Sequence, residues 1–322
     1  MAATKSAYWT SRSNEKFPLQ DTAQVTATFS RRMRVRLSNG SSVQARIKGK
    51  RQRPVCGDEV FVEPIAGEAE WLITGIGARR NELTRPNRRG EAEVLAANID
   101  QLCAVAAPTP KPDWFIIDRY LGAAELMGVR GIVIVNKTDL VRESDALSAD
   151  VSEAATDYGR IGYTLVRSSA STGDGLEELV AVLGKGISIF VGQSGVGKSS
   201  LINLLLGESS QRIGDLSDKN REGRHTTVNS VMLDLPGGGA VIDSPGVRDY
   251  APALQSERDV NLGFVEIADA ASGCRFADCK HMVEPGCAVR NAVEAGAISE
   301  RRYESYRRLF ILTSQLAERR SR

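Results

Sequence analysis

Residues 187–206 have the sequence ISIFVGQSGVGKSSLINLLL, and this stretch decides the fold. Its centre, Gly192-Gln193-Ser194-Gly195-Val196-Gly197-Lys198-Ser199, matches the G-x-x-x-x-G-K-S pattern of the Walker A phosphate loop. The apolar run at 187–191 predicts a buried strand and residues 200–206 predict a helix, which is the context that this loop requires. Loop N–H groups would bind phosphate oxygens, Lys198 would reach the β- and γ-phosphates, and Ser199 would bind Mg²⁺. The alternative is a Gly/Ser turn before a core helix, but the full match favours a nucleoside triphosphate site.

The composition is that of an ordinary globular protein. The 322 residues are 42% apolar and 25% charged, with a net charge of +2, which fits two or three domains. No apolar run approaches the roughly 20 residues needed to cross a bilayer. Residues 1–16 also lack the apolar core of a secretory signal. We therefore expect a cytoplasmic protein that binds no membrane and is a monomer.

Residues 1–23 are polar and aperiodic, which predicts a disordered tail. Residues 24–90 are predicted to form a small barrel, because short alternating segments are separated by turn residues. The predicted strands are 24–30, 33–37, 43–47, 59–63 and 71–76. This pattern is typical of the oligonucleotide/oligosaccharide-binding fold (OB-fold), and an SH3-like barrel would give a similar one.

The predicted barrel carries a cluster of basic residues, here called the basic patch. It consists of Arg31, Arg32, Arg34, Arg36, Arg46, Lys48, Lys50, Arg51 and Arg53, with no acidic residue between the first and the last. Arg32, Arg34 and Arg36 alternate, so they would share one strand face. A merely solvated face normally mixes charges of both signs, so the patch favours nucleic acid. The scarcity of aromatic residues favours contact with the backbone and shape of a folded RNA.

Residues 91–252 alternate between predicted strands and helices, which indicates an α/β nucleotide-binding domain. A predicted strand at 130–135 ends in Asn136-Lys137-Thr138-Asp139, an N-K-x-D sequence. The carboxylate of Asp139 would accept hydrogen bonds from guanine N1–H and N2–H, a donor pair that adenine lacks. The Lys137 stem would lie along the base, and Asn136 would brace the neighbouring loops. Ser169 and Ala170 follow the next predicted strand, where a backbone N–H can contact guanine O6. With the phosphate loop in the same domain, these residues predict a guanine nucleotide.

Two further motifs would surround the γ-phosphate. A polar segment ends in Gly223-Arg224-His225-Thr226-Thr227. Thr227 is the first candidate in this segment for reaching Mg²⁺, and Thr226 is the second. Asp243-Ser244-Pro245-Gly246 is a D-x-P-G sequence, in which Asp243 would hold Mg²⁺ through water and the Gly246 N–H would sense the γ-phosphate. In Ras-like GTPases N-K-x-D comes after these motifs, whereas here it comes first. The motif set is therefore complete but circularly permuted.

Residues 253–322 are predicted to form a helical domain around a metal site. Cys274, Cys279, His281 and Cys287 have the spacing C-x4-C-x-H-x5-C. Three thiolates and one imidazole are typical of a closed, structural Zn²⁺ site, and free structural cysteines are the alternative. Helices are predicted at 287–295 and 299–316. On the second helix, the arginines would form either a second RNA contact or a solvated face; they are Arg301, Arg302, Arg307 and Arg308.

Together these features resemble the bacterial ribosome small subunit-dependent GTPase A family. The resemblance covers nearly the whole chain from about residue 25, through the permuted motif order, the basic barrel before it and the cysteine cluster behind it, and it extends the phosphate loop to Ser200. It implies a late-acting assembly factor on the small (30S) ribosomal subunit that contacts rRNA. It also implies that the subunit stimulates hydrolysis of GTP to GDP and phosphate.

The water-orienting residue is the least defined part of the site. Val247 follows D-x-P-G, where Ras-like enzymes place a glutamine, so slow intrinsic hydrolysis is predicted. His225 is the candidate for orienting the water, from its position and from the resemblance; a residue that docks the switch is the alternative.

Two other function classes fit parts of the sequence. An RNA-binding protein with a structural, non-switching nucleotide site would bind the subunit equally in its GTP and GDP states. A P-loop ATPase or kinase would prefer ATP, which the N-K-x-D sequence argues against.

Overall fold

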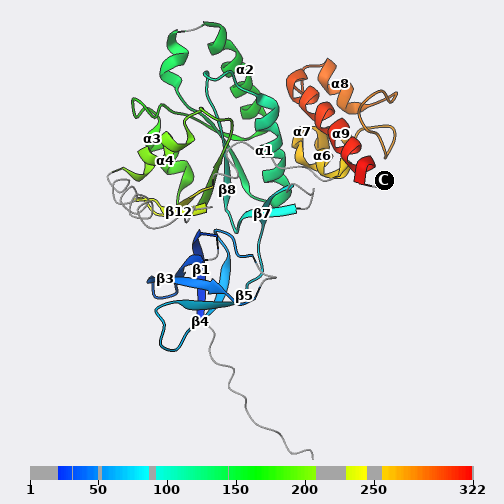
Figure 1. Cartoon of the computed structure of the whole chain (residues 1–322). Helices are drawn as coiled ribbons and strands as arrows, with labels where there is room; N and C mark the ends of the chain where they lie inside the picture. The colour runs from blue at the N-terminus through cyan, green and yellow to red at the C-terminus, as the bar shows by residue number, and fades with distance from the viewer. Residues whose placement is uncertain are drawn as a thin grey trace, which may run out of the picture.

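The computed structural model describes residues 21–30, 32–49, 53–86, 92–143, 145–207, 230–244 and 256–320. Figure 1 shows a barrel, an α/β domain above it, and a helical C-terminal domain beside the helix α1 (Trp114–Met127). This arrangement confirms the predicted fold class. Within the described ranges, no helix combines the length and apolar character needed to cross a membrane.

Five strands close the N-terminal barrel. They are β1 (Asp21–Thr28), β2 (Arg32–Leu37), β3 (Ser42–Ile47), β4 (Glu59–Pro64) and β5 (Trp71–Ile76). They pair in the order β1-β2-β3-β5-β4, β4 returns to β1, and β3 and β5 are parallel. Val25, Val35, Val60 and Ile73 fill the core because they alternate inward along their strands. This pairing order is that of an OB-fold, so the predicted barrel is confirmed.

A hairpin that the sequence pattern did not predict connects the barrel to the α/β domain. It consists of β6 (Glu82–Pro86) and β7 (Ala92–Ala97), which pair antiparallel. The domain boundary predicted at residue 90 falls between these two strands. It stays a prediction, as do the other domain boundaries.

A mostly parallel sheet forms the α/β domain. Its order is β10-β9-β8-β11-β13-β12, with only β12 antiparallel to its neighbour β13. The strands are β8 (Gln101–Ala106), β9 (Arg130–Val135), β10 (Thr164–Arg167), β11 (Ile187–Val191), β12 (Ser230–Asp234) and β13 (Ala240–Asp243). The two faces bury separate apolar clusters. Helices α1 and α2 (Asp145–Ile161) cover one face, and α3 (Leu176–Leu183) and α4 (Lys198–Leu206) cover the other.

The barrel extends this sheet directly. Strand β1 pairs antiparallel with β12, and Ala27 lies opposite Val231. Beside this pairing, the Arg36 guanidinium donates two hydrogen bonds to the Asp234 carboxylate, at 2.8 and 2.7 Å. One sheet therefore runs from the barrel to the strands around the phosphate loop.

The C-terminal domain contains four described helices around its own apolar core. They are α6 (Glu257–Gly263), α7 (Val265–Ala271), α8 (Ala288–Glu294) and α9 (Glu300–Arg320), and the sequence pattern predicted only the last two. Ser256 begins α6 with a capping box, in which its side chain and that of Asp259 bond each other's backbone N–H. This local signal identifies the start of α6.

The arginines of α9 correct one expectation from the sequence. Arg302 is fully buried and forms ion pairs with Asp118 and Glu266, and Arg301 contacts Asp118 as well. These two side chains hold α9 against α1 and α7, so their assignment to a second RNA contact or to a solvated face is wrong. Arg308 lies over the ring of Phe115 on α1, at 4.2 Å from its centre.

Candidate guanine-nucleotide site and metal centre

The phosphate loop, residues 192–199, connects β11 to α4 at the carboxyl edge of the sheet. Two of its glycines have backbone conformations and surroundings that exclude a side chain. At Gly192 (φ +137) a Cβ would lie 2.2 Å from the carbonyl oxygen of Val105, and at Gly197 (φ +94) it would lie 2.3 Å from Nδ2 of Asn136. The loop therefore fits tightly between β8 and the N-K-x-D loop.

Lys198 begins α4, and its ammonium group folds back over the loop. Nζ donates to the carbonyl oxygens of Gly192 and Gln193, each at 2.6 Å. The charge thus lies at the mouth of the loop, beside the N-terminus of α4, where the partial charge of the helix is also positive. Such a position suits a lysine that binds phosphate.

Asn136 connects the phosphate loop to the base-recognition loops. Its Nδ2 donates to the carbonyl oxygen of Val196 at 2.8 Å, and its Oδ1 accepts from the Ala170 N–H at 3.1 Å. The predicted bracing role of Asn136 agrees with these contacts. The Ala170 N–H is occupied by Asn136 here, so the contact to guanine O6 stays a prediction.

Lys137 spans the gap between three loops. It has a left-handed backbone (φ +60), and its Nζ donates to the carbonyl oxygens of Thr109 at 2.8 Å and Gly195 at 2.7 Å. The Lys137 side chain therefore connects the N-K-x-D loop to the loop at Thr109 and to the phosphate loop. Thr109 was missed in the sequence, although its place just after the predicted strand at 99–106 is where ligands of open α/β sheets bind.

Asp139 is held by the loop that carries Ser169 and Ala170. The Ser169 hydroxyl donates to Oδ1 of Asp139 at 2.6 Å. This hydrogen bond lowers the pKa of Asp139 below its ordinary value. Thr138 fixes the same junction, because its N–H and hydroxyl both donate to the Ser168 carbonyl, at 3.1 and 3.0 Å. The carboxylate is thus oriented and ionised, as an acceptor for the guanine edge must be.

Strand β13 lies beside β11, the strand that leads into the phosphate loop. Asp243 ends this strand, which pairs with β11 of the phosphate loop. Next to it, the Ser230 hydroxyl donates to the Ser244 hydroxyl at 2.9 Å, joining the start of β12 to the end of β13. Ser199 and Ser200 lie exposed in the first turn of α4. The predicted sites at His225, Thr227 and Gly246 lie outside the described residues.

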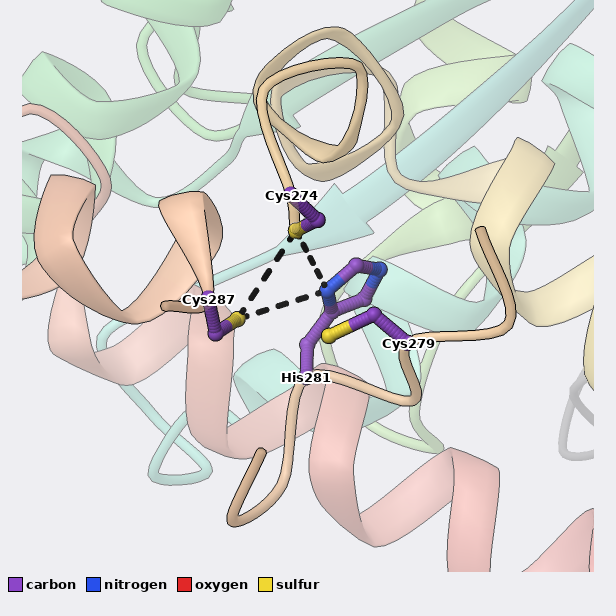
Figure 2. A group of neighbouring side chains, drawn as sticks. All are labelled: Cys274, Cys279, His281 and Cys287. Atoms are coloured by element: carbon purple, nitrogen blue, oxygen red, sulfur yellow. Dashed lines mark hydrogen bonds between the residues drawn. The ribbon is translucent and has the colours of Figure 1, made fainter. Parts of the chain in front are cut away.

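The four predicted metal ligands converge in the C-terminal domain. Figure 2 shows Cys274, Cys279, His281 and Cys287 pointing at one another from a loop and from the start of α8. Their ligand atoms all lie within 4.8 Å of one another. Nδ1 of His281 is 3.5 Å from the sulfur atoms of both Cys274 and Cys287, and those two sulfurs are 4.0 Å apart.

These separations fit a tetrahedral metal ion. Zinc bonds of about 2.3 Å to sulfur and about 2.0 Å to nitrogen, at tetrahedral angles, place two sulfurs about 3.8 Å apart and a sulfur and nitrogen about 3.5 Å apart. The donor set of three thiolates and one imidazole leaves no position open for a substrate. The cluster can therefore hold a metal in a structural role.

Neighbouring groups fix residues 279–284, here called the ligand loop because it carries the metal ligands Cys279 and His281. The Glu284 carboxylate accepts hydrogen bonds from the N–H groups of Lys280, Met282 and Val283. Burial would raise the pKa of Glu284, but these N–H groups lower it to about 2. From α9, the Tyr303 hydroxyl donates to the His281 carbonyl at 2.5 Å. The loop is thus tied to the helix that contacts α1.

Some described residues of the basic patch pair with an acidic side chain, and the others form no ion pair with a described residue. Met33 and Val35 point into the barrel, so Arg32, Arg34 and Arg36 share the outer face as predicted. Arg32 pairs with Glu70, Arg46 with Glu68 and Arg36 with Asp234. Lys48 and Arg53 are exposed, Arg34 is partly exposed, and Arg31, Lys50 and Arg51 lie outside the described residues. Acidic partners that are distant in sequence make the patch less uniformly positive than its sequence indicates.

This fold and site define the protein class: a P-loop GTPase with circularly permuted motifs between a barrel and a metal-binding domain. A family model described as RsgA GTPase matches residues 76–252. A Pseudomonas fluorescens protein named "Small ribosomal subunit biogenesis GTPase RsgA" is 46% identical over 253 residues, which cover 79% of this chain and 73% of that protein. A Pseudomonas aeruginosa protein of the same name is 41% identical over 290 residues, covering 90% and 85%. The chain belongs to the RsgA GTPase family.

Solved structures show the same architecture. The crystal structure of YjeQ from Thermotoga maritima has a TM-score of 0.73 and 30% identity, and the match covers 92% of this chain and 99% of that one. The structure of YloQ, described as a circularly permuted GTPase, has a TM-score of 0.72 and 25% identity over 94% of this chain and 98% of that one. The likeness therefore includes the regions on both sides of the GTPase domain.

Proposed function

We propose that this chain is a GTPase that binds the small (30S) ribosomal subunit during its late maturation, hydrolyses GTP to GDP and phosphate, and is stimulated by the subunit. The relatives named for small ribosomal subunit biogenesis support the partner and the process. The convergence of Asn136, Asp139 and the phosphate loop carries the nucleotide assignment. A cytoplasmic, monomeric protein fits this function.

In this proposal each group of the site has a separate task. Asp139, held by Ser169, and Lys137, held by the carbonyl oxygens of Thr109 and Gly195, select guanine. Asn136 braces the loops around them through Val196 and Ala170. Lys198 and the loop N–H groups bind the phosphates. Mg²⁺, held by Ser199, Thr227 and Asp243, would neutralise charge on the phosphate oxygens. Gly246 senses the γ-phosphate, and His225 orients the attacking water.

The remaining assignments concern the two flanking domains. Cys274, Cys279, His281 and Cys287 hold one structural Zn²⁺, which is the metal that a closed set of three thiolates and one imidazole prefers. The barrel contacts rRNA through the basic patch, with Lys48 and Arg53, which are exposed, and Arg34, which is partly exposed, as the described members outside the ion pairs given above. The domains divide near residues 24, 91 and 253.

The test measures GTP hydrolysis by the purified chain with and without small ribosomal subunits. We expect slow hydrolysis alone and a large stimulation by small subunits, with large subunits as the control. ATP in place of GTP should give no stimulated hydrolysis. Equal rates with and without subunits would refute the proposed function, and a preference for ATP would refute the guanine site.

His225 is tested in the same assay. The variant His225→Ala should bind GDP normally and lose most of the stimulated turnover, since only the positioning of the water is removed. Stimulated turnover that matches the unmodified chain would show that His225 does not orient the water.

A further inference from the structure

Helix α1 contacts the nucleotide loops at its N-terminus and the C-terminal domain along its side. Its N-cap residue, Asp113, donates its backbone N–H to Oε1 of Gln193 in the phosphate loop at 2.9 Å. The Asp113 side chain accepts the Ile116 N–H and so fixes the start of the helix. The Gln193 side chain is therefore bound by the start of α1, whereas its carbonyl oxygen accepts from Lys198 of the phosphate loop.

The C-terminal domain packs against α1, beginning at the first turn of that helix. Arg301 lies over the ring of Trp114, and Arg308 lies over the ring of Phe115. Further along, Gly122 and Gly263 bring α1 and α6 so close that a Cβ on Gly263 would be 3.0 Å from Cα of Gly122. Figure 1 shows α6 and α9 beside α1 in this arrangement.

A buried network of charged side chains fixes the C-terminal domain against α1. Asp118 of α1 accepts from Nη1 of Arg302 at 2.9 Å, from Nη1 of Arg301 at 3.1 Å and from the Tyr158 hydroxyl at 2.7 Å. Asp118, Tyr158 and Arg302 are fully buried. Arg302 also forms a two-bond contact with Glu266 of α7, at 2.7 and 3.0 Å.

The two contacts of α1 are close together. Asp113 and Asp118 are five residues apart, which is a rise of about 7.5 Å along a helix. A helical segment this short moves as a rigid body, and buried hydrogen-bonded charge pairs tolerate little displacement. A shift of the C-terminal domain therefore reaches Gln193 through less than two turns of α1.

We propose that the C-terminal domain sets the position of the phosphate loop through α1, with Asp118 and Arg302 as positioning residues and Gln193 as the residue that receives the effect. A partner that moves the C-terminal domain would thereby change nucleotide affinity by a route separate from the γ-phosphate contacts. This inference rests on the proposed guanine-nucleotide site.

A double-mutant cycle on the full-length, zinc-loaded chain tests this inference. The affinity for GDP is measured by titration of a fluorescent GDP for the unmodified chain, Gln193→Ala, Arg302→Met and the double variant. Asp118→Asn, alone and combined with Gln193→Ala, gives a second double-mutant cycle with a milder substitution. This second cycle tests the coupling if Arg302→Met loses zinc or fails to fold. Arg258→Met, an exposed arginine on α6, is the matched control. Zinc content and circular dichroism verify each fold.

The expected result is non-additivity. Arg302→Met or Asp118→Asn should weaken GDP binding about threefold or more in the unmodified background and less than about 1.5-fold in the Gln193→Ala background. Arg258→Met should change neither. The same fold-change in both backgrounds, or unchanged GDP affinity in folded, zinc-loaded variants, would overturn the inference. Failure of the unmodified chain to bind GDP would instead refute the proposed function.

Discussion

Asn136 donates a hydrogen bond from Nδ2 to the carbonyl oxygen of Val196 at 2.8 Å, across 60 residues of sequence. The same side chain accepts the Ala170 N–H. A single buried amide thus holds together the loops for phosphate and for base. In the permuted chain these loops are far apart in sequence, so their alignment depends on side-chain contacts of this kind.

Replacing Asn136 should therefore weaken the whole nucleotide site. Asn136→Ala leaves the Val196 carbonyl and the Ala170 N–H without this partner, and each lost buried hydrogen bond costs about 1–3 kcal/mol. We expect GDP and GTP affinities to fall by at least about tenfold. Titration with fluorescent nucleotides measures both, with Asn39→Ala in a barrel turn as the control. Equal affinities for Asn136→Ala and the unmodified chain would contradict the bracing role.

The hydrogen bond from Ser169 predicts how guanine binding responds to pH. It lowers the pKa of Asp139, so the carboxylate keeps its charge to lower pH than an ordinary aspartate would. The binding contribution of the charged form is present above the ordinary pKa and is lost only as pH falls through the lowered one. Ser169→Ala should move this loss of GDP affinity to higher pH, toward the ordinary pKa of 3.8.

The measurement for Ser169 is GDP affinity as a function of pH in the acid range where the chain remains folded. Ser171→Ala is the matched control, because the Ser171 hydroxyl is 2.9 Å from the Ser169 hydroxyl and its contribution to the Asp139 pKa is smaller. Identical acid profiles for Ser169→Ala and the unmodified chain would show that Ser169 does not set the charge of Asp139. Asp139→Asn, measured alongside, should relax the preference for guanine over other bases.

The residues of the basic patch should fall into two groups that differ in how much they contribute to binding of the ribosomal subunit. Arg34 and Lys48 are available to phosphates, so Arg34→Ala and Lys48→Ala should each weaken subunit binding and reduce its salt dependence by about one counterion. Arg36 is neutralised by Asp234, so Arg36→Ala should lower the salt dependence much less. Binding measured over a salt series distinguishes the groups, and equal slopes for all three variants would contradict this division.

Removal of the metal should act first on the C-terminal domain. Structural zinc contributes on the order of 10 kcal/mol to the folding of zinc-finger peptides, and here the ligand loop is tied to α9 through Tyr303. A chelator, or Cys279→Ser, should remove zinc and lower the melting temperature of this domain before that of the α/β domain. Glu284→Ala should speed zinc loss. A zinc-free chain with an unchanged melting profile would contradict a structural metal.

The local part of this architecture could be predicted from the sequence, and the contacts between domains could not. Strand alternation predicted the barrel, and short motifs located Asp139, Lys198 and Cys274, because each depends on residues that are close in the chain. Arg36 and Arg302 instead meet partners 198 and 184 residues away, Asp234 and Asp118. A local charge pattern cannot distinguish such a buried or paired arginine from one that faces RNA. Helices α6 and α7 were missed, although the Ser256 and Asp259 capping box marks the start of α6.

The most direct test of the account is co-sedimentation of the full chain with purified small ribosomal subunits in the presence of GDP or of a non-hydrolysable GTP analogue. We expect stable binding with the analogue and release with GDP, as a GTPase that switches between two nucleotide states on the subunit requires. Equal binding in both states would contradict it and would favour an RNA-binding protein whose nucleotide site is only structural.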